Sequence, residues 1–95
     1  MEPIVGLLTA ELYIPDTMSL KDKRSVVTSL LERLSNRFNV SVAEIDALDN
    51  HRRTIIAITT VANDLKHVTR VLDTVITYIE GEPRAVLEST QVEYL

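Results

Sequence analysis

The stretch SLKDKRSVVTSLLERLSNRFNVSVA, residues 19–43, holds a helix start, an amphipathic helix and the opening of a strand with almost no connecting residues. Ser19 is a favoured N-cap because its hydroxyl can accept from an unpaired N–H of the first turn, and Asp22 stands where a reciprocal cap is expected. The apolar residues recur with the helical period and share one arc: Leu20, Val27, Leu30, Leu31, Leu34 and Phe38. This arc predicts a helix that lies on a sheet.

Outside this stretch the apolar residues alternate with the two-residue period of strands. We expect strands at 4–14, 40–47, 53–62 and 85–95, and a second helix that is capped by Asn63 and stopped by Gly81 and Pro83. The strand at 40–47 has a mixed pattern, which a bulge or an edge position would explain. The strand at 53–62 is apolar on both faces, which favours the middle of the sheet.

The expected order is therefore βαββαβ, the split βαβ arrangement of ferredoxin-like folds. It predicts an α+β protein in which a four-stranded antiparallel sheet carries both helices on one face. The 95 residues contain no linker or low-complexity run, so we expect a single domain over residues 1–95. Many unrelated functions use this fold, and function must be argued from individual residues.

Composition excludes several classes of protein. The chain has no cysteine, which removes disulfides, thiolate metal sites and a cysteine nucleophile, and favours a reducing cytoplasm. No apolar run is long enough to span a membrane, and the N-terminus lacks the basic region of a signal peptide. A net charge of −4 argues against a protein held to nucleic acid by its overall charge, although a local basic patch stays open.

Two segments, SLKDKRSVV at 19–27 and NRFNVSVAE at 36–44, resemble the signature of the YlxP-like family of small bacterial proteins. The likeness extends more weakly over nearly the whole chain. The resemblance implies a fold more than an activity, because the family has no established biochemical role. It also suggests a link to the translation apparatus, which makes the ribosome or another structured RNA a natural candidate partner.

Three activities known for this topology lack their residues here. The loop 15–18 has no glycine with which to cradle a phosphate, as acylphosphatase-like enzymes require, and it has no cysteine pair for a transported metal. The two central strands carry no aromatic platform on which RNA bases could stack. We therefore expect a protein that is not an enzyme, needs no cofactor and works by binding.

A first candidate site is basic and belongs to the first helix. Its members are Lys21, Lys23, Arg24, Arg33 and Arg37. Backbone donors and cations at a helix N-terminus can hold a phosphate, so this cluster could contact RNA without reading bases. Lys23 falls inside the apolar arc, with Arg24 on one flank and Arg33 and Arg37 on the other. The alternative is a solvated helix start in which Asp16 and Asp22 pair with the cations.

A second candidate is the set Glu44, Asp46, Asp49 and His51, which follows the second strand into its turn. Carboxylates and an imidazole can ligate a metal, but Arg52 and Arg53 are equally near and would pair with the same carboxylates. In the YlxP-like family this turn often has an Asp, a large residue and then Gln-Arg. Asp49 and Arg53 match that pattern, whereas the residues between them do not.

A third candidate is the sheet face opposite the helices. Contiguous apolar surface of several hundred Å² usually marks an interface. The members that we expect there are Leu7, Tyr13, Ile56, Ile58, Val92 and Tyr94. This predicts a homo-oligomer or a partner-binding protein as the alternative to an RNA-binding module.

Overall fold

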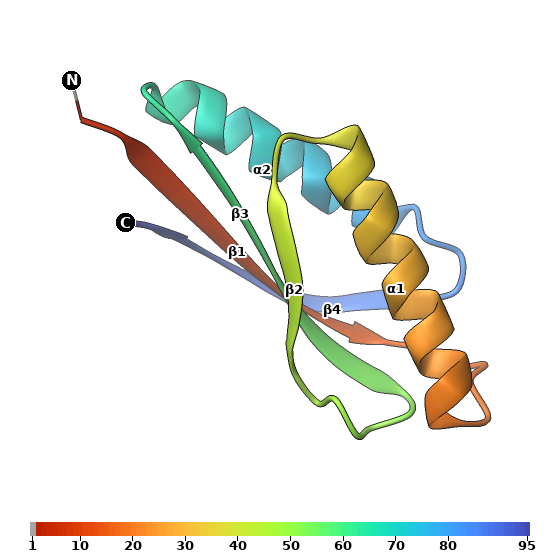
Figure 1. Cartoon of the computed structure of the whole chain (residues 1–95). Coiled ribbons are helices and arrows are strands. Elements are labelled where there is room, and N and C mark those ends of the chain that lie inside the picture. The colour runs from red at the N-terminus through yellow and green to blue at the C-terminus, as the bar shows by residue number, and fades with distance from the viewer. Residues whose placement is uncertain (1) are drawn as a thin grey trace.

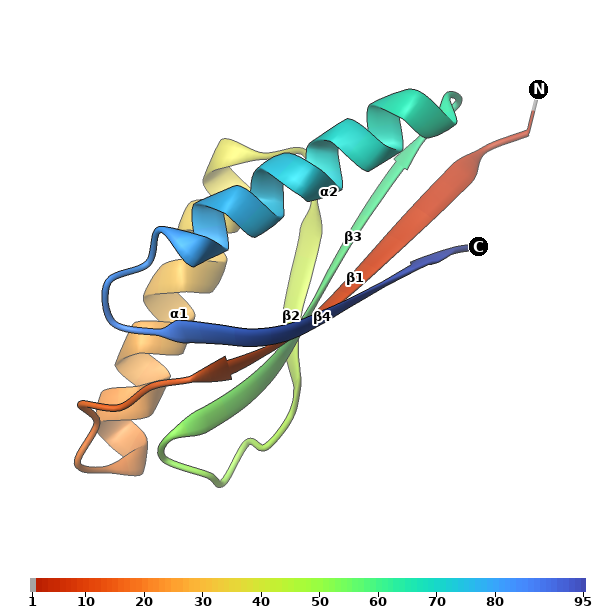
Figure 2. The same ribbon diagram turned by 180° about the vertical axis from the view of Figure 1, so that it is seen from behind.

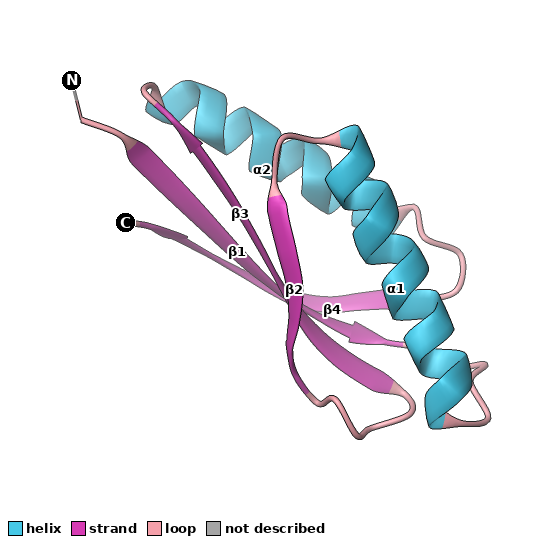
Figure 3. Ribbon diagram, in the orientation of Figure 1, coloured by secondary structure: helices cyan, strands magenta, loops and turns pink. Residues whose placement is uncertain are grey.

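The computed structural model describes residues 2–95 and contains the six expected elements in the expected order (Figure 1). They are β1 (Ile4–Tyr13), α1 (Leu20–Arg37), β2 (Ser41–Asp46), β3 (Arg53–Ala62), α2 (Leu65–Glu80) and β4 (Val86–Tyr94). The strands form one sheet in the order β2-β3-β1-β4, and each neighbouring pair is antiparallel (Figure 3). The predicted ferredoxin-like α+β fold is confirmed.

The core lies between one face of the sheet and the two helices. Leu8, Ala10 and Leu12 of β1 are buried on this face together with Ile56 and Ile58 of β3. The helices contribute the apolar stripes that the sequence predicts, of which Val27, Leu30, Leu34, Val68, Leu72, Val75 and Ile79 are buried. Burial of each large side chain contributes about 1.5–3 kcal/mol, so the helices are main stabilisers of the fold.

Gly6 allows α2 to approach β1 closely. A Cβ atom at this position would lie 2.5 Å from Cγ1 of Val68 and 2.8 Å from Cδ1 of Leu72. Both distances are far below van der Waals contact, and both neighbours are buried. The missing side chain therefore sets how near α2 lies to the sheet.

Capping fixes where both helices begin. The Ser19 hydroxyl accepts from the Asp22 N–H at 3.1 Å, as predicted, while the Asp22 carboxylate accepts from the Met18 N–H at 3.2 Å. The predicted cap of α2 was one residue too early: Asp64, not Asn63, is the N-cap, and its carboxylate accepts from the Lys66 N–H at 3.1 Å. A negatively charged side chain at this position is also stabilised by the positive end of the helix dipole.

The two edge strands differ in length, and the pairing of each with its neighbour contains one register shift. β2 has six residues, and its pairing with β3 shifts register between Glu44 and Asp46, which confirms the irregular edge strand expected from its pattern. β4 has nine residues and runs along the outer margin of the sheet (Figure 2). Among residues 2–95, neither helix is both long and apolar enough to cross a lipid bilayer.

Candidate nucleic-acid interface

Lys23, which the sequence places in the basic cluster, is completely buried. Its ammonium group lies 2.6 Å from Oε2 of Glu44 and donates to the carbonyl oxygens of Ala47 at 2.9 Å and Leu48 at 3.4 Å. These three acceptors match the three donors of an ammonium group. Glu44 in turn accepts from the Thr54 hydroxyl at 2.6 Å.

The role predicted for Lys23 as a phosphate contact is therefore wrong, because no donor of its buried ammonium group is free to meet a ligand. Its place in the apolar arc of α1 directs the side chain under the β2–β3 loop. There it holds two loop carbonyls, one of them from Ala47, whose φ of 58° is the left-handed conformation. Lys23 is a structural residue of the fold.

The loop between β1 and α1 is also held in place. The hydroxyl of Thr17, which is buried, is within hydrogen-bonding distance of the carbonyl oxygens of Ile14 and His51. The Ile14 N–H donates to the Arg52 carbonyl at 2.8 Å. This loop therefore packs against the β2–β3 loop.

The acidic residues of β2 and its turn do not converge with His51. Glu44 is occupied by Lys23 and Thr54, and the Asp46 carboxylate accepts from the Ala47 N–H at 2.7 Å. Across residues 2–95 no three histidine or acidic side chains are grouped so that they could hold a metal ion.

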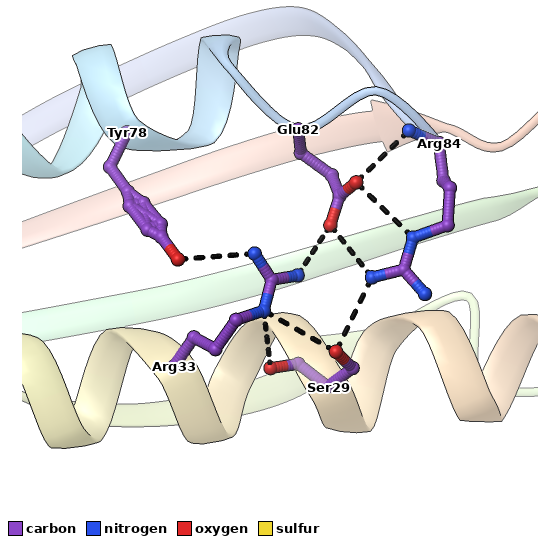
Figure 4. A network of polar contacts seen from close by, with 5 residues as sticks. All are labelled: Ser29, Arg33, Tyr78, Glu82 and Arg84. Carbon is purple, nitrogen blue, oxygen red and sulfur yellow. Dashed lines mark hydrogen bonds and ion pairs between the residues drawn. The ribbon is translucent and has the colours of Figure 1, made fainter.

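At the opposite end of α1, Arg33 belongs to a polar network with α2 and the loop that follows it (Figure 4). Its guanidinium donates to the Tyr78 hydroxyl at 3.1 Å and pairs with the Glu82 carboxylate. Arg84 pairs with the same carboxylate at 2.9 Å and reaches the Ser29 hydroxyl at 3.3 Å. The network joins the two helices where they meet.

Glu82 is the centre of this network, and its side chain is only 1% exposed. Hydrogen bonds from the Arg84 side chain lower the pKa of Glu82 to about 2. Burial acts in the opposite direction, whereas the Arg84 N–H and Arg33 lower the pKa further. Burial opposes the charge of Arg33, yet its hydrogen bonds to Glu82 and Tyr78 keep its pKa above the ordinary value. The carboxylate therefore stays ionised and fixes both arginines.

Arg37 lies one turn beyond Arg33 and is exposed. Its guanidinium carbon is 5.2 Å from the centre of the Tyr78 ring, and that of Arg33 is 5.7 Å from the same ring. Phe38 meets Tyr78 edge to face, with ring centres 5.9 Å apart. An aromatic ring thus holds two cations on the side of α1 that faces α2.

Three adjoining hollows follow the outer surface of the two helices from this point. One is lined by Arg33, Asn36, Arg37 and Tyr78, the next by Arg37, Phe38, Thr74, Thr77, Tyr78 and Gly81, and the third by Lys66, Thr69, Arg70, Asp73, Thr74 and Thr77. Because neighbouring hollows share lining residues, they form one continuous depression, which we call the helix groove.

The helix groove is positively charged although the chain is acidic. Arg33, Arg37, Lys66 and Arg70 line it, and Asp73 is the one acidic residue among the lining residues. Within the described chain, Arg37, Lys66 and Arg70 form no ion pair. The sequence reasoning missed Lys66 and Arg70, whose spacing of four residues along the exposed side of α2 was the available signal.

The structure divides the predicted basic cluster into three parts. Lys21 and Arg24 are exposed at the start of α1, Lys23 is buried, and Arg33 and Arg37 lie at the other end. At 100° per residue, Arg24 projects from the flank of the helix opposite to that of Arg33 and Arg37. The five residues therefore do not form one surface.

The predicted sheet interface is also divided. Ile56 and Ile58 were assigned to the wrong face, since both are fully buried under the helices. Leu7 and Tyr13 do lie on the open face, because they alternate with the buried residues of β1. Arg53 stacks on Tyr13, with 5.5 Å from its guanidinium carbon to the ring centre, and pairs with Glu11 and Glu88. That half of the open face is therefore polar.

Val92 and Tyr94 belong to the other side of the sheet. Their partners in β1 are Leu8 and Gly6, so their side chains point to the face that carries the helices. Even so, Val92 is 40% exposed and Tyr94 is 48% exposed, since the helices cover β4 incompletely.

The fold and the open groove define a small ferredoxin-like α+β protein with a charged surface that extends from the end of α1 over the outer face of α2. The chain belongs to the family described as "Protein of unknown function (DUF503)", whose model matches residues 5–92. It is 33% identical over 91 residues to a protein of Bacillus subtilis (strain 168) named "Uncharacterized protein YlxP", an alignment that covers 96% of this chain and 99% of the relative. The resemblance seen in the sequence is thereby confirmed.

Among solved structures, the chain is similar to the "De novo designed protein Foldit4". The TM-score is 0.55 at 12% sequence identity, over 99% of this chain and 97% of the designed one. At this identity the similarity concerns the fold alone.

Proposed function

We propose that this protein works by binding rather than by catalysis, and that its helix groove contacts the phosphate backbone of a structured RNA. The observation that supports this proposal is the concentration of cations. Four basic residues and one acidic residue line a continuous depression on a chain whose net charge is −4. Phosphate contacts of this kind position a protein on RNA without reading its sequence.

The form of the groove favours a polymer over an enclosed small molecule. Its three hollows are open to solvent and lie along the helices, whereas small-molecule sites enclose most of the ligand surface. Arginine is suited to such contacts because its planar guanidinium can donate two hydrogen bonds to one phosphate. The ribosome, in a bacterial cytoplasm, is the RNA that we propose to test first.

The test measures binding of a fluorescently labelled RNA hairpin and co-sedimentation with bacterial ribosomes, each over a range of salt concentrations. The triple variant Arg37→Ala, Lys66→Ala and Arg70→Ala removes three groove cations and leaves the Glu82 network intact. It should bind more weakly, and the slope of log affinity against log salt should fall by about 2–3, since each phosphate contact contributes roughly 0.7–0.9.

The matched control is Lys21→Ala combined with Arg24→Ala, which removes exposed cations at the start of α1. This double variant should bind as the wild type does. Equal loss of affinity in both variants would indicate a general charge effect and contradict the assignment to the groove. Absence of binding to the hairpin and to ribosomes at low salt would refute the RNA proposal altogether.

A further inference from the structure

The outer edge of β4 carries unpaired backbone groups. Val5 and Leu95 exchange both of their N–H to carbonyl hydrogen bonds, at 3.5 and 2.8 Å, so the backbone groups of Leu95 point toward β1. Hydrogen-bonding direction alternates along an antiparallel strand. The N–H and C=O groups of Thr90, Val92 and Tyr94 therefore point outward, away from β1, along the edge that has no neighbouring strand.

The outer part of this edge is less protected than β2. β2 has six residues, and its register shift with β3 lies between Glu44 and Asp46. β4 has nine residues and no proline or lysine, and its register shift with β1 lies between Leu87 and Ser89, before the segment from Thr90 to Tyr94. A regular edge segment of this kind can add a further strand.

Apolar side chains lie beside the open edge. Val92 is 40% exposed and Tyr94 is 48% exposed on the side that carries the helices. The Tyr94 hydroxyl is 3.1 Å from the Thr69 hydroxyl, which shows that this flank of α2 faces β4. Leu65, one turn before Thr69 and therefore on the same flank, is 49% exposed. Together these side chains form an uncovered apolar strip between α2 and the edge of the sheet.

We propose that a second copy of this chain covers the strip by pairing its β4 antiparallel with this one, about a two-fold axis through Val92. Val92 of one copy would then lie opposite Val92 of the other, and Tyr94 would lie opposite Thr90. All of these residues have outward-pointing backbone groups, and all of their side chains lie on the helix side. The pattern is therefore self-complementary, as a two-fold interface requires.

Charge and space are compatible with this pairing. Glu93 would face Gln91 of the copy and Glu88 would lie beyond the end of the copy's strand, so no two carboxylates would be opposed. α2 packs over β1, where it meets Gly6, and leaves the helix side of β4 open for the copy. The helix groove and the strip share Thr69 alone, and the pairing uses none of the groove cations, so the inference does not depend on the proposed function.

The first test is the mass of the protein in solution, from sedimentation equilibrium over a range of concentrations. Wild-type protein should be a dimer, Val92→Lys should be a monomer, and an equal mixture of Val92→Lys and Val92→Glu should recover the dimer. The matched control is Val86→Lys, at an exposed apolar residue on the same strand but outside the pairing, and it should stay dimeric. Far-UV circular dichroism checks that each variant is folded.

A monomeric wild type at every soluble concentration would overturn the proposal. A dimer that survives Val92→Lys but dissociates in Leu7→Lys would also overturn it, by placing the contact on the open sheet face.

A second measurement does not require the interface to be broken. Because the chain has no cysteine, Val92→Cys introduces a single thiol. Opposed hydrogen-bonded residues have Cα atoms about 5.5 Å apart, which is inside the range of roughly 4.4–6.8 Å for disulfides. Oxidation of Val92→Cys should give a covalent dimer and that of Val86→Cys should not; the reverse result would refute the pairing.

Discussion

The two ends of α1 carry cations that look alike in the sequence and have opposite surroundings in the structure. At the N-terminal end, Lys23 is fully buried and its ammonium group is saturated by Glu44 and two carbonyls. At the C-terminal end, Arg33 is 38% exposed, and its neighbour Arg37 is free of ion pairs within the described residues. The surroundings of a cation on a helix therefore depend on what packs beside its turn, which is a loop at one end of α1 and a second helix at the other.

The largest expected effect comes from the buried end. Lys23→Ala leaves the Glu44 carboxylate, which is 15% exposed, without its charged partner and leaves two loop carbonyls unpaired. We expect the free energy of unfolding to fall by about 3–5 kcal/mol, the usual cost of removing one partner of a buried ion pair. Urea denaturation measures this free energy, and Lys21→Ala is the control. Similar losses in the two variants would contradict the expected difference between the buried and the exposed lysine.

The next effect concerns Glu82 and its dependence on pH. Because its pKa is lowered from 4.5 to about 2, its stabilising contribution is complete above pH 4.5 and is lost as the pH falls toward 2. The shift corresponds to about 3 kcal/mol. Glu82→Gln should therefore cost about that much at pH 7 and almost nothing near pH 2. Urea midpoints across this range test the expectation, and the exposed Glu80→Gln is the control; a constant difference between wild type and Glu82→Gln would contradict it.

A smaller effect is expected from Arg33→Lys. The ammonium group keeps the charge but cannot reproduce the fork that reaches Tyr78 and Glu82 together. We expect a loss of about 1–2 kcal/mol in the free energy of unfolding. Arg37→Lys, which changes one exposed cation over the Tyr78 ring, should lose less than about 0.5 kcal/mol. Equal losses would show that the network adds nothing beyond charge.

The smallest effect belongs to the exposed cations at the start of α1. Lys21→Ala and Arg24→Ala should each change the free energy of unfolding by less than about 0.5 kcal/mol, and removal of a cation from the positive end of the helix dipole favours a slight gain. Thermal unfolding measures both variants. A loss above about 1 kcal/mol in either variant would mean that the exposed cations stabilise this turn, although exposed ion pairs usually contribute less than that.

The order of the elements and the central position of β3 could be predicted because hydrophobic periodicity and capping residues act locally. The position of Lys23 within the apolar arc of α1 was visible in the sequence, but Lys23 was predicted to contact phosphate rather than to be buried. What could not be seen was its set of acceptors, because the carbonyls of Ala47 and Leu48 turn inward through a left-handed residue that is not glycine. No local preference of alanine signals that conformation.

The misplaced residues of β3 have a different physical reason. Ile55 and Ile56 are neighbours of equal hydrophobicity, so the pattern of a strand that is apolar on both sides does not say which of them faces the helices. The helix groove was missed because it depends on how two helices, distant in sequence, lie against one another. Lys66 and Arg70 belong to the groove because the hollow that they line continues, through Thr74 and Thr77, into the hollow that Arg37 lines.

The pairing of β1 with β4 also has a consequence for how the chain folds during synthesis. Leu8 of the first strand lies opposite Val92 of the last, so β1 can pair with β4 only after nearly all of these residues have been synthesised. Contacts between such distant segments slow folding, because a large loop must be closed before they can form. Until β4 emerges from the ribosome, one edge of β1 stays open to other chains, and the interval in which the newborn protein is prone to aggregate ends only when this strand is added.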